Sequence, residues 1–281
     1  MLLGKTVDFG ATDAFLSDEE LAQTAQEILH IPTCLGAVAI IYNLPDNPEL
    51  RFTPELIADV FLGRIKNWSD PSITSANQTA ALPDIDITVV HRSDSSGTSF
   101  IFTDYLSRVN ALWERSVGRG KIVRWPTGMG VERNHAVADM VKAIHGSIGY
   151  VELSYAAENY LPMALVKNGS GNFIKPSLES VSLAAEVELP ADTRMIITDT
   201  PAPSGYPISA FTYLIFFKEQ SYNNRSKEKA VELARFLWWI THNGQPFNGQ
   251  LLYAPLSLAA VAKTEAIIRT MQYNGRPIVS R

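Results

Sequence analysis

Apolar runs of strand length alternate along the chain with segments whose apolar residues recur at helical spacing. The predicted strands cover residues 7–11, 35–42, 85–90, 148–151, 194–197 and 211–217. The predicted helices begin near residues 17, 54, 98, 135, 178, 227 and 255. Strands that alternate with helices indicate the α/β class with mostly parallel, doubly wound sheets, in which ligands bind beyond the carboxyl ends of strands.

Local signals set the bounds of the first elements. Residues 7–11 predict a short buried strand, and Ser17 with Glu20 has capping-box spacing for an amphipathic helix that extends to Leu29. The pair Thr53-Pro54 predicts a second helix start, and this helix is expected to end near Phe61 because Gly63 favours a stop.

Composition narrows the class of partner. The 281 residues are 46% hydrophobic and 19% charged, which suits a globular protein with one large or two smaller cores. The net charge of −5 and the absence of a long Lys/Arg run give no footprint for nucleic acid. Cys34 is the single cysteine, so no internal disulfide forms, and no spacing suggests a metal site or a cofactor.

The ends and the apolar runs bear on export and membranes. The first residues show neither the charged region, nor the apolar region, nor the cleavage site that a signal peptide has. The most apolar runs, residues 37–42 and 211–217, are far shorter than the roughly 20 residues that span a bilayer. We therefore expect a soluble protein.

The candidate chemistry lies in the sequence HRSDSSGT at residues 91–98, between the strand over residues 85–90 and a helix. A helix N-terminus has unpaired backbone N–H groups, so the amides of Gly97 and Thr98 can bind an anion. Ser96 adds a hydroxyl donor, and Arg92 supplies a charged fork suited to tetrahedral oxyanions. Asp94 is placed to orient Arg92.

Other interpretations of this turn remain open. Such residues often only cap a helix and turn the chain. The turn matches neither the phosphate-binding loop of NTPases nor the dinucleotide fingerprint. Catalysis by Ser96 needs a base, and His91 is a poor candidate because neighbouring side chains on a strand point to opposite faces. We interpret His91 as structural.

Several segments closely resemble the phosphate-binding proteins that serve phosphate-specific ABC transporters. Two of them are TVDFGATDA at residues 6–14 and TVVHRSDSSGT at residues 88–98. Four more are FLGRIKNWSDP at 61–71, FTDYLS at 102–107, GSIGYVE at 146–152 and GYPI at 205–208. The resemblance spans nearly the whole chain.

The resemblance implies a type II periplasmic-binding-protein-like fold of two α/β lobes. Lobe one would comprise residues 1–36 and 207–281, and lobe two residues 37–206. The protein would not be an enzyme. It would bind inorganic phosphate between its lobes, with no cofactor, and deliver it to the membrane permease of an ABC importer, in the periplasm or at the cell surface.

The resemblance also assigns roles to individual residues. Asp13 would accept a hydrogen bond from the proton of phosphate. Arg92 would pair with the oxyanion while Asp94 holds Arg92. The remaining donors, through side chain or backbone, would be Ser96, Gly97 and Thr98.

The chain departs from the family pattern at its start. The family has a strand-helix-strand-helix segment before the part that matches residues 7–13. We therefore expect the first lobe to be incomplete at its N-terminus, through truncation, a misassigned start or a separate complementing chain. Two other functions stay open: a phosphatase-like hydrolase that uses the Ser96 turn, and a sensor or interaction protein that keeps the fold but binds ligand weakly.

Overall fold

The computed structural model describes residues 2–278 and divides into two compact units. The first unit contains the chain up to Leu35, residues 186–196 and the chain from Phe211 onwards. The second contains residues 36–185 and 197–210. The chain thus passes from one unit to the other four times, and two strands, β2 (Ile28–Tyr42) and β9 (Ser209–Phe217), contribute residues to both.

The first unit combines strands with C-terminal helices. Its other strands are β1 (Gly10–Thr12), β10 (Gln272–Tyr273) and β11 (Arg276–Pro277), and its helices are α1 (Asp18–Ala22), η1 (Tyr222–Asn224), α9 (Lys227–Thr241), α10 (Gln245–Asn248), η2 (Gly249–Leu251) and α11 (Leu258–Ile268). Strand β1 pairs antiparallel with β9, whose other neighbour is β2.

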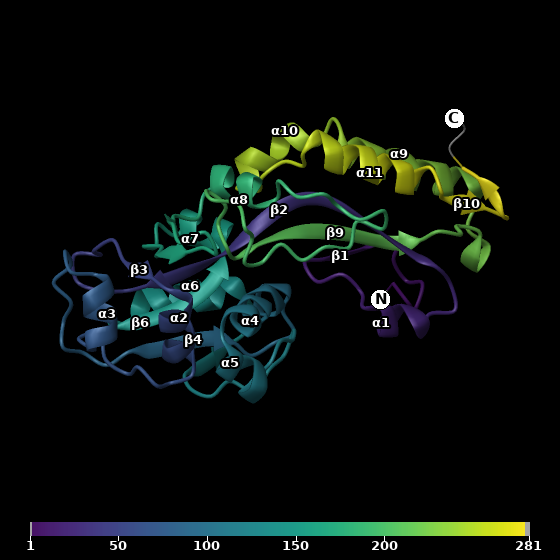
Figure 1. Ribbon diagram of the computed structural model, residues 1–281. Helices are drawn as coiled ribbons and strands as arrows, with labels where there is room; N and C mark the ends of the chain where they lie inside the picture. The colour runs from purple at the N-terminus through teal and green to yellow at the C-terminus, as the bar shows by residue number, and fades with distance from the viewer. Residues whose placement is uncertain (1, 279–281) are drawn as a thin grey trace. The chain divides into compact units, whose positions relative to one another are not determined.

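Helices α9 and α11 run alongside each other over strands β2 and β9 (Figure 1). The apolar face of α9 repeats at helical spacing and buries Leu233 and Leu237. These side chains meet Phe216 from β9 and Ile268 from α11 in one core cluster. Burial of this face, rather than helix propensity, stabilises the first unit.

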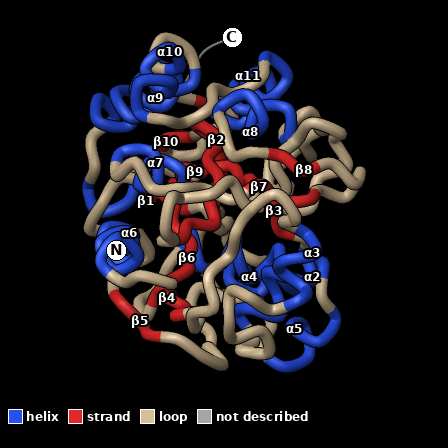
Figure 2. The backbone as a smooth tube through the Cα atoms, turned by 90° about the vertical axis from the view of Figure 1, so that its left-hand side faces the viewer, coloured by secondary structure: helices blue, strands red, loops and turns tan. Residues whose placement is uncertain are grey.

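The second unit is built around a sheet in which β2 neighbours β6 (Ser147–Glu152), β6 neighbours β4 (Thr88–Arg92) and β4 neighbours β5 (Met129–Val131) (Figure 2). Strand β4 runs parallel to both β5 and β6, whereas β2 is antiparallel to β6. A smaller sheet holds β3 (Arg51–Phe52), β7 (Leu165–Lys167) and β8 (Phe173–Ile174). The predicted α/β class is confirmed.

Seven helices accompany these strands in the described part of the second unit. They are α2 (Pro54–Phe61), α3 (Pro71–Ala76), α4 (Gly97–Val109), α5 (Ala111–Ser116), α6 (Arg133–Ala143), α7 (Leu153–Glu158) and α8 (Leu178–Ala184). The bounds predicted for α2 are confirmed: Thr53 caps it, and Gly63 follows with a φ of 71°. Glycine adopts that left-handed conformation without steric strain.

Three predictions of local structure were wrong. Strand β1 begins at Gly10 and is only half-buried, whereas a buried strand over residues 7–11 was expected. The capping box of Ser17 and Glu20 is present, but α1 ends at Ala22 and the apolar residues 28 and 29 start β2 instead. Residues 194–197 form no strand. For β1 and β2, pairing with the distant strand β9 decides the structure, and local patterning does not show that pairing.

None of the helices within residues 2–278 combines the length and the apolar character needed to cross a bilayer.

Candidate anion-binding site

Strand β4 lies between its two parallel neighbours, and its carboxyl end leads directly into helix α4. The apolar Val89 and Val90 are buried in the sheet, so the strand is fixed and delivers Arg92 to its end. Ser96 then caps α4 with its hydroxyl, which accepts a hydrogen bond from the amide of Ser99 at 3.1 Å. The predicted sequence of strand, polar turn and helix is confirmed.

An aromatic cluster supports this turn from beneath. The ring of Tyr150 on β6 stacks on Phe102 of α4 with centroids 4.4 Å apart. Its hydroxyl accepts a hydrogen bond from the amide of Arg92 at 3.1 Å and lies 2.6 Å from the hydroxyl of Ser99. Burial raises the pKa of Tyr150 to about 12, so the hydroxyl stays protonated. Tyr150 thereby connects β4, β6 and α4.

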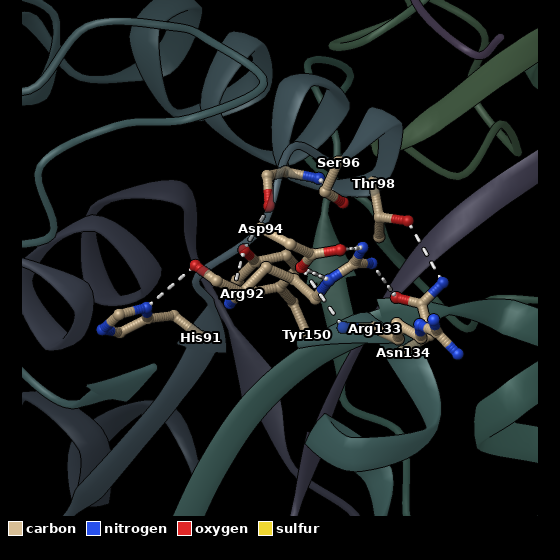
Figure 3. A network of polar contacts seen from close by, with 9 residues as sticks. His91, Arg92, Asp94, Ser96, Thr98, Arg133, Asn134 and Tyr150 are labelled. Carbon is tan, nitrogen blue, oxygen red and sulfur yellow. Dashed lines mark hydrogen bonds and ion pairs between the residues drawn. The ribbon is translucent and has the colours of Figure 1, made fainter. Parts of the chain in front are cut away.

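Arg92 is held rigidly at the strand end. Its guanidinium is 8% exposed, and Nε and Nη2 donate to the two carboxylate oxygens of Asp94 at 2.6 and 2.7 Å. Nη1 donates to Oδ1 of Asn134 at 3.0 Å (Figure 3). A guanidinium carries five N–H groups. Within residues 2–278 these three bonds are its hydrogen bonds, so one N–H on each Nη remains for an outside acceptor.

Asp94 is ionised across the physiological range. The hydrogen bonds from Arg92 lower its pKa to about 2. The amide of Arg133 also donates to Asp94 Oδ1, at 3.2 Å. The predicted orienting contact between Asp94 and Arg92 is therefore present, in the bidentate geometry that favours arginine over lysine.

The start of α4 presents hydrogen-bond donors. The amides of Gly97 and Thr98 make no hydrogen bond within the described residues, as expected for the first turn of a helix. The amide of Ser96, in contrast, donates to the carbonyl of Lys121 at 3.0 Å, so only its hydroxyl can donate to a ligand. The structure thus brings Arg92, Ser96, Gly97 and Thr98 together at one strand-to-helix junction.

Sequence reasoning missed Asn134. It lies at the start of α6, and its amide group contacts both Arg92 and Thr98. Helix α6 approaches the sheet closely because Gly149 faces it: a Cβ at this position would lie 3.0 Å from Val141 of α6. An asparagine 42 residues after Arg92 carries no local signal of this contact; only the fold brings it there.

Asp13 belongs to the first unit, where it follows β1. Its Oδ1 accepts a hydrogen bond from the hydroxyl of Thr212 on β9 at 2.7 Å. Burial raises the pKa of Asp13, and the bond from Thr212 opposes that rise. The predicted role of Asp13 stays a prediction.

Within residues 2–278, no group of three or more His, Cys, Asp or Glu side chains is placed to hold a metal ion. His91 Nδ1 donates to the carbonyl of Arg92 at 3.1 Å, and the imidazole stacks on Trp125 with ring centroids 4.8 Å apart. Both contacts are structural in kind.

The family model described as the PBP superfamily domain matches residues 1–243. The chain belongs to the PBP superfamily. Its curated relatives in this superfamily include the phosphate-binding protein PstS of Pasteurella multocida, 38% identical over 96% of this chain and 78% of the relative. The phosphate-binding protein PstS of Xylella fastidiosa strain 9a5c is 40% identical over 93% of this chain and 71% of the relative.

Among solved structures, this PBP superfamily chain is similar to a high-affinity periplasmic phosphate-binding protein bound with phosphate, called PfluDING. The two share 22% sequence identity, and the match has a TM-score of 0.74 over 92% of this chain and 78% of the other. At this identity the similarity establishes the fold. The resemblance inferred from residues 6–14 and 88–98 is confirmed, and so is the type II periplasmic-binding-protein-like fold.

Proposed function

We propose that this protein binds inorganic phosphate and delivers it to an ABC-type importer. Relatives at 38% and 40% identity carry the name phosphate-binding protein PstS, and they align over more than 90% of this chain. Identity of this extent makes a shared function the simplest account of the chain.

One observation carries the proposal: the junction of β4 and α4 offers several hydrogen-bond donors that have no acceptor within the described residues. Arg92 retains two unbonded N–H groups, and the amides of Gly97 and Thr98 are unbonded within the described residues. Backbone amides at a helix start and a clamped guanidinium together suit the several acceptor oxygens of a phosphate.

The roles of the individual residues form part of the proposal. Arg92, Ser96, Gly97 and Thr98 donate hydrogen bonds to phosphate, and Asp94 holds Arg92 in place. Asp13 accepts a hydrogen bond from the proton that phosphate keeps near neutral pH. A carboxylate repels a fully ionised sulfate, so Asp13 selects against that anion.

The cellular setting follows from the same relationship. We place the protein in the periplasm or at the cell surface, since the similar solved protein PfluDING is described as periplasmic. Its macromolecular partner is the permease of the importer. The two-lobe division with residues 1–36 and 207–281 in one lobe and 37–206 in the other is retained as a proposal. The compact units differ from it by assigning residues 186–196 to the first unit, and residues 36 and 207–210 to the second.

A hydrolase that uses Ser96 is disfavoured by the contacts of its neighbours. The Ser96 hydroxyl accepts from the amide of Ser99, and the imidazole of His91 bonds to the carbonyl of Arg92. Figure 3 shows His91 directed away from Ser96 and Thr98. A serine nucleophile needs a base within hydrogen-bond reach, and His91 does not serve as one. We therefore propose a non-enzymatic binding protein.

Calorimetric titration of the purified chain with inorganic phosphate and with sulfate tests the function. We expect saturable phosphate binding at one site per chain, a raised thermal midpoint with phosphate, and much weaker sulfate binding. Turnover of p-nitrophenyl phosphate would support the hydrolase instead. A folded chain that neither binds phosphate nor hydrolyses the ester would support the ligand-impaired sensor.

A further inference from the structure

Asn134 connects two groups of the proposed phosphate site. Its Oδ1 accepts a hydrogen bond from Arg92 Nη1 at 3.0 Å, and its Nδ2 donates to the hydroxyl of Thr98 at 3.3 Å (Figure 3). It comes from α6, whereas Arg92 and Thr98 come from β4 and α4. The side-chain amide therefore bridges three elements of the second unit.

The orientation of this amide is dictated by its neighbours. A guanidinium can only donate hydrogen bonds, so the Asn134 oxygen must face Arg92. The NH₂ group consequently faces Thr98 and uses a lone pair of the Thr98 hydroxyl. With that lone pair engaged, the Thr98 proton is free to point toward another acceptor.

The backbone holds Asn134 in this position. The amide of the preceding residue, Arg133, donates to Asp94 Oδ1 at 3.2 Å. Arg133 has a φ of 69°, a left-handed conformation that non-glycine residues rarely adopt and that surrounding contacts must hold. Asp94 thus fixes Arg92 through its side chain and Asn134 through the neighbouring backbone.

The hydroxyl of Ser96, like that of Thr98, accepts a hydrogen bond from an N–H group of the protein. The Ser96 hydroxyl accepts from the amide of Ser99, so its own proton is free to donate. Both hydroxyls at the junction therefore keep a proton to donate, alongside the amides of Gly97 and Thr98. An array made only of donors suits an anion whose oxygens accept every bond.

We propose that Asn134 is a positioning residue for the phosphate site, which sets the Thr98 hydroxyl as a hydrogen-bond donor to the ligand. The inference rests on the proposed function, since it takes phosphate as the ligand. It assigns to Asn134 an effect on affinity that passes through Thr98 and not through the stability of α6.

A double-mutant cycle measures this coupling by phosphate calorimetry. Asn134→Ala lowers phosphate affinity about three- to tenfold in the parent, as expected for losing the benefit of one oriented hydrogen bond. In a Thr98→Val background, which lacks the hydroxyl, the same substitution has a much smaller effect. Asn134→Asp lowers phosphate affinity further than Asn134→Ala. The new carboxylate accepts a hydrogen bond from the Thr98 hydroxyl, which then cannot donate to phosphate, and its charge repels the anion.

Asn43 provides the matched control. Its Nδ2 donates to the carbonyls of Val141 and Lys142 at the other end of α6 and makes no bond to Arg92 or Thr98. Asn43→Ala lowers the thermal midpoint while phosphate affinity stays at the parent value.

The outcomes separate the two proposals. Suppose that the parent binds phosphate. If Asn134→Ala then weakens phosphate binding equally in the parent and in the Thr98→Val background, or does not weaken it at all, the inference is wrong and the proposed phosphate-binding function is unaffected. Loss of affinity in Asn43→Ala equal to that in Asn134→Ala also overturns it, because loosening of α6 then explains the effect. A folded parent that does not bind phosphate overturns the proposed function and the inference with it.

Discussion

The carboxylate of Asp13 accepts a hydrogen bond from the hydroxyl of Thr212 across 199 residues of sequence, at 2.7 Å. The bond joins the end of β1 to β9, the strand with which β1 pairs. Thr212 occupies one oxygen of the carboxylate and fixes its orientation. Burial nevertheless raises the pKa of Asp13, so the ionised carboxylate destabilises the folded state.

Asp13→Asn should narrow the preference for phosphate over sulfate. An asparagine oxygen still accepts the bond from Thr212, but the substitution removes the negative charge that repels sulfate. Competition binding between the two anions measures the ratio of affinities. Unchanged discrimination in a variant that still binds phosphate would remove Asp13 from the recognition of the ligand.

The same substitution should stabilise the protein without ligand at neutral pH. Folding raises the pKa of this carboxyl group. At a pH above the folded pKa the ionised group therefore destabilises the fold, whereas at a pH below the unfolded pKa of about 4 it has no such effect. Asp13→Asn removes this penalty. Its thermal midpoint should therefore exceed that of the parent at pH 7, and the difference should vanish toward pH 3. An equal difference at both values of pH would contradict the assignment.

Arg92→Lys should weaken phosphate binding by about 1–3 kcal/mol. Lysine keeps the charge but loses the fork that contacts Asp94 with two N–H groups and leaves two for the ligand. Calorimetry measures the change, and Arg64→Lys is the control because Arg64 has a 59% exposed side chain paired with Asp59. Parent-like affinity in Arg92→Lys would show that the guanidinium is not a ligand.

Asp94→Asn should lower the thermal midpoint most at neutral pH. Folding lowers the pKa of Asp94 to about 2, so its ionised form adds stability above about pH 4, and this contribution is lost as the pH falls toward 2. The difference between parent and variant should shrink over that interval. Thermal unfolding from pH 7 to pH 2 checks the trend, and a constant difference would show that the ion pair with Arg92 is not its source.

Ser96→Ala should reduce both stability and affinity. The variant loses the cap of α4, worth about 0.5–2 kcal/mol, and a hydroxyl donor at the proposed site. Ser226 caps α9 in the same way, through a bond from the amide of Lys229. Ser226→Ala should thus lower the thermal midpoint and leave phosphate affinity intact. Equal affinity losses in the two variants would assign the effect of Ser96 to stability alone.

The site was predictable from sequence where it is continuous along the chain. An apolar strand, a polar turn with Arg92 and Asp94, and a helix start at Gly97 form one local unit, and local patterning describes such a unit well. The contact of Asp94 with Arg92 spans two residues, so the sequence also predicted that Asp94 orients Arg92, although not the bidentate geometry.

The rest of the site depends on long-range packing. Asn134 and Tyr150 reach Arg92 because α6 and β6 pack beside β4, and nothing in the sequence around either residue specifies that contact. The wrong extension of α1 to Leu29 has a related cause: residues 28 and 29 fit the end of a helix or the start of a strand, and the neighbouring strand β9 decides between them.

The pairing of Arg92 with Asp94 has a consequence for ionic strength. The two charges cancel at distances beyond the pair, and the whole chain is acidic with a net charge of −5. The site therefore exerts little long-range electrostatic attraction on phosphate, so screening by salt should change phosphate binding little. The junction of β4 and α4 instead binds phosphate through oriented hydrogen-bond donors that act at short range. Capture of phosphate should accordingly proceed nearly as well in concentrated salt as in dilute buffer.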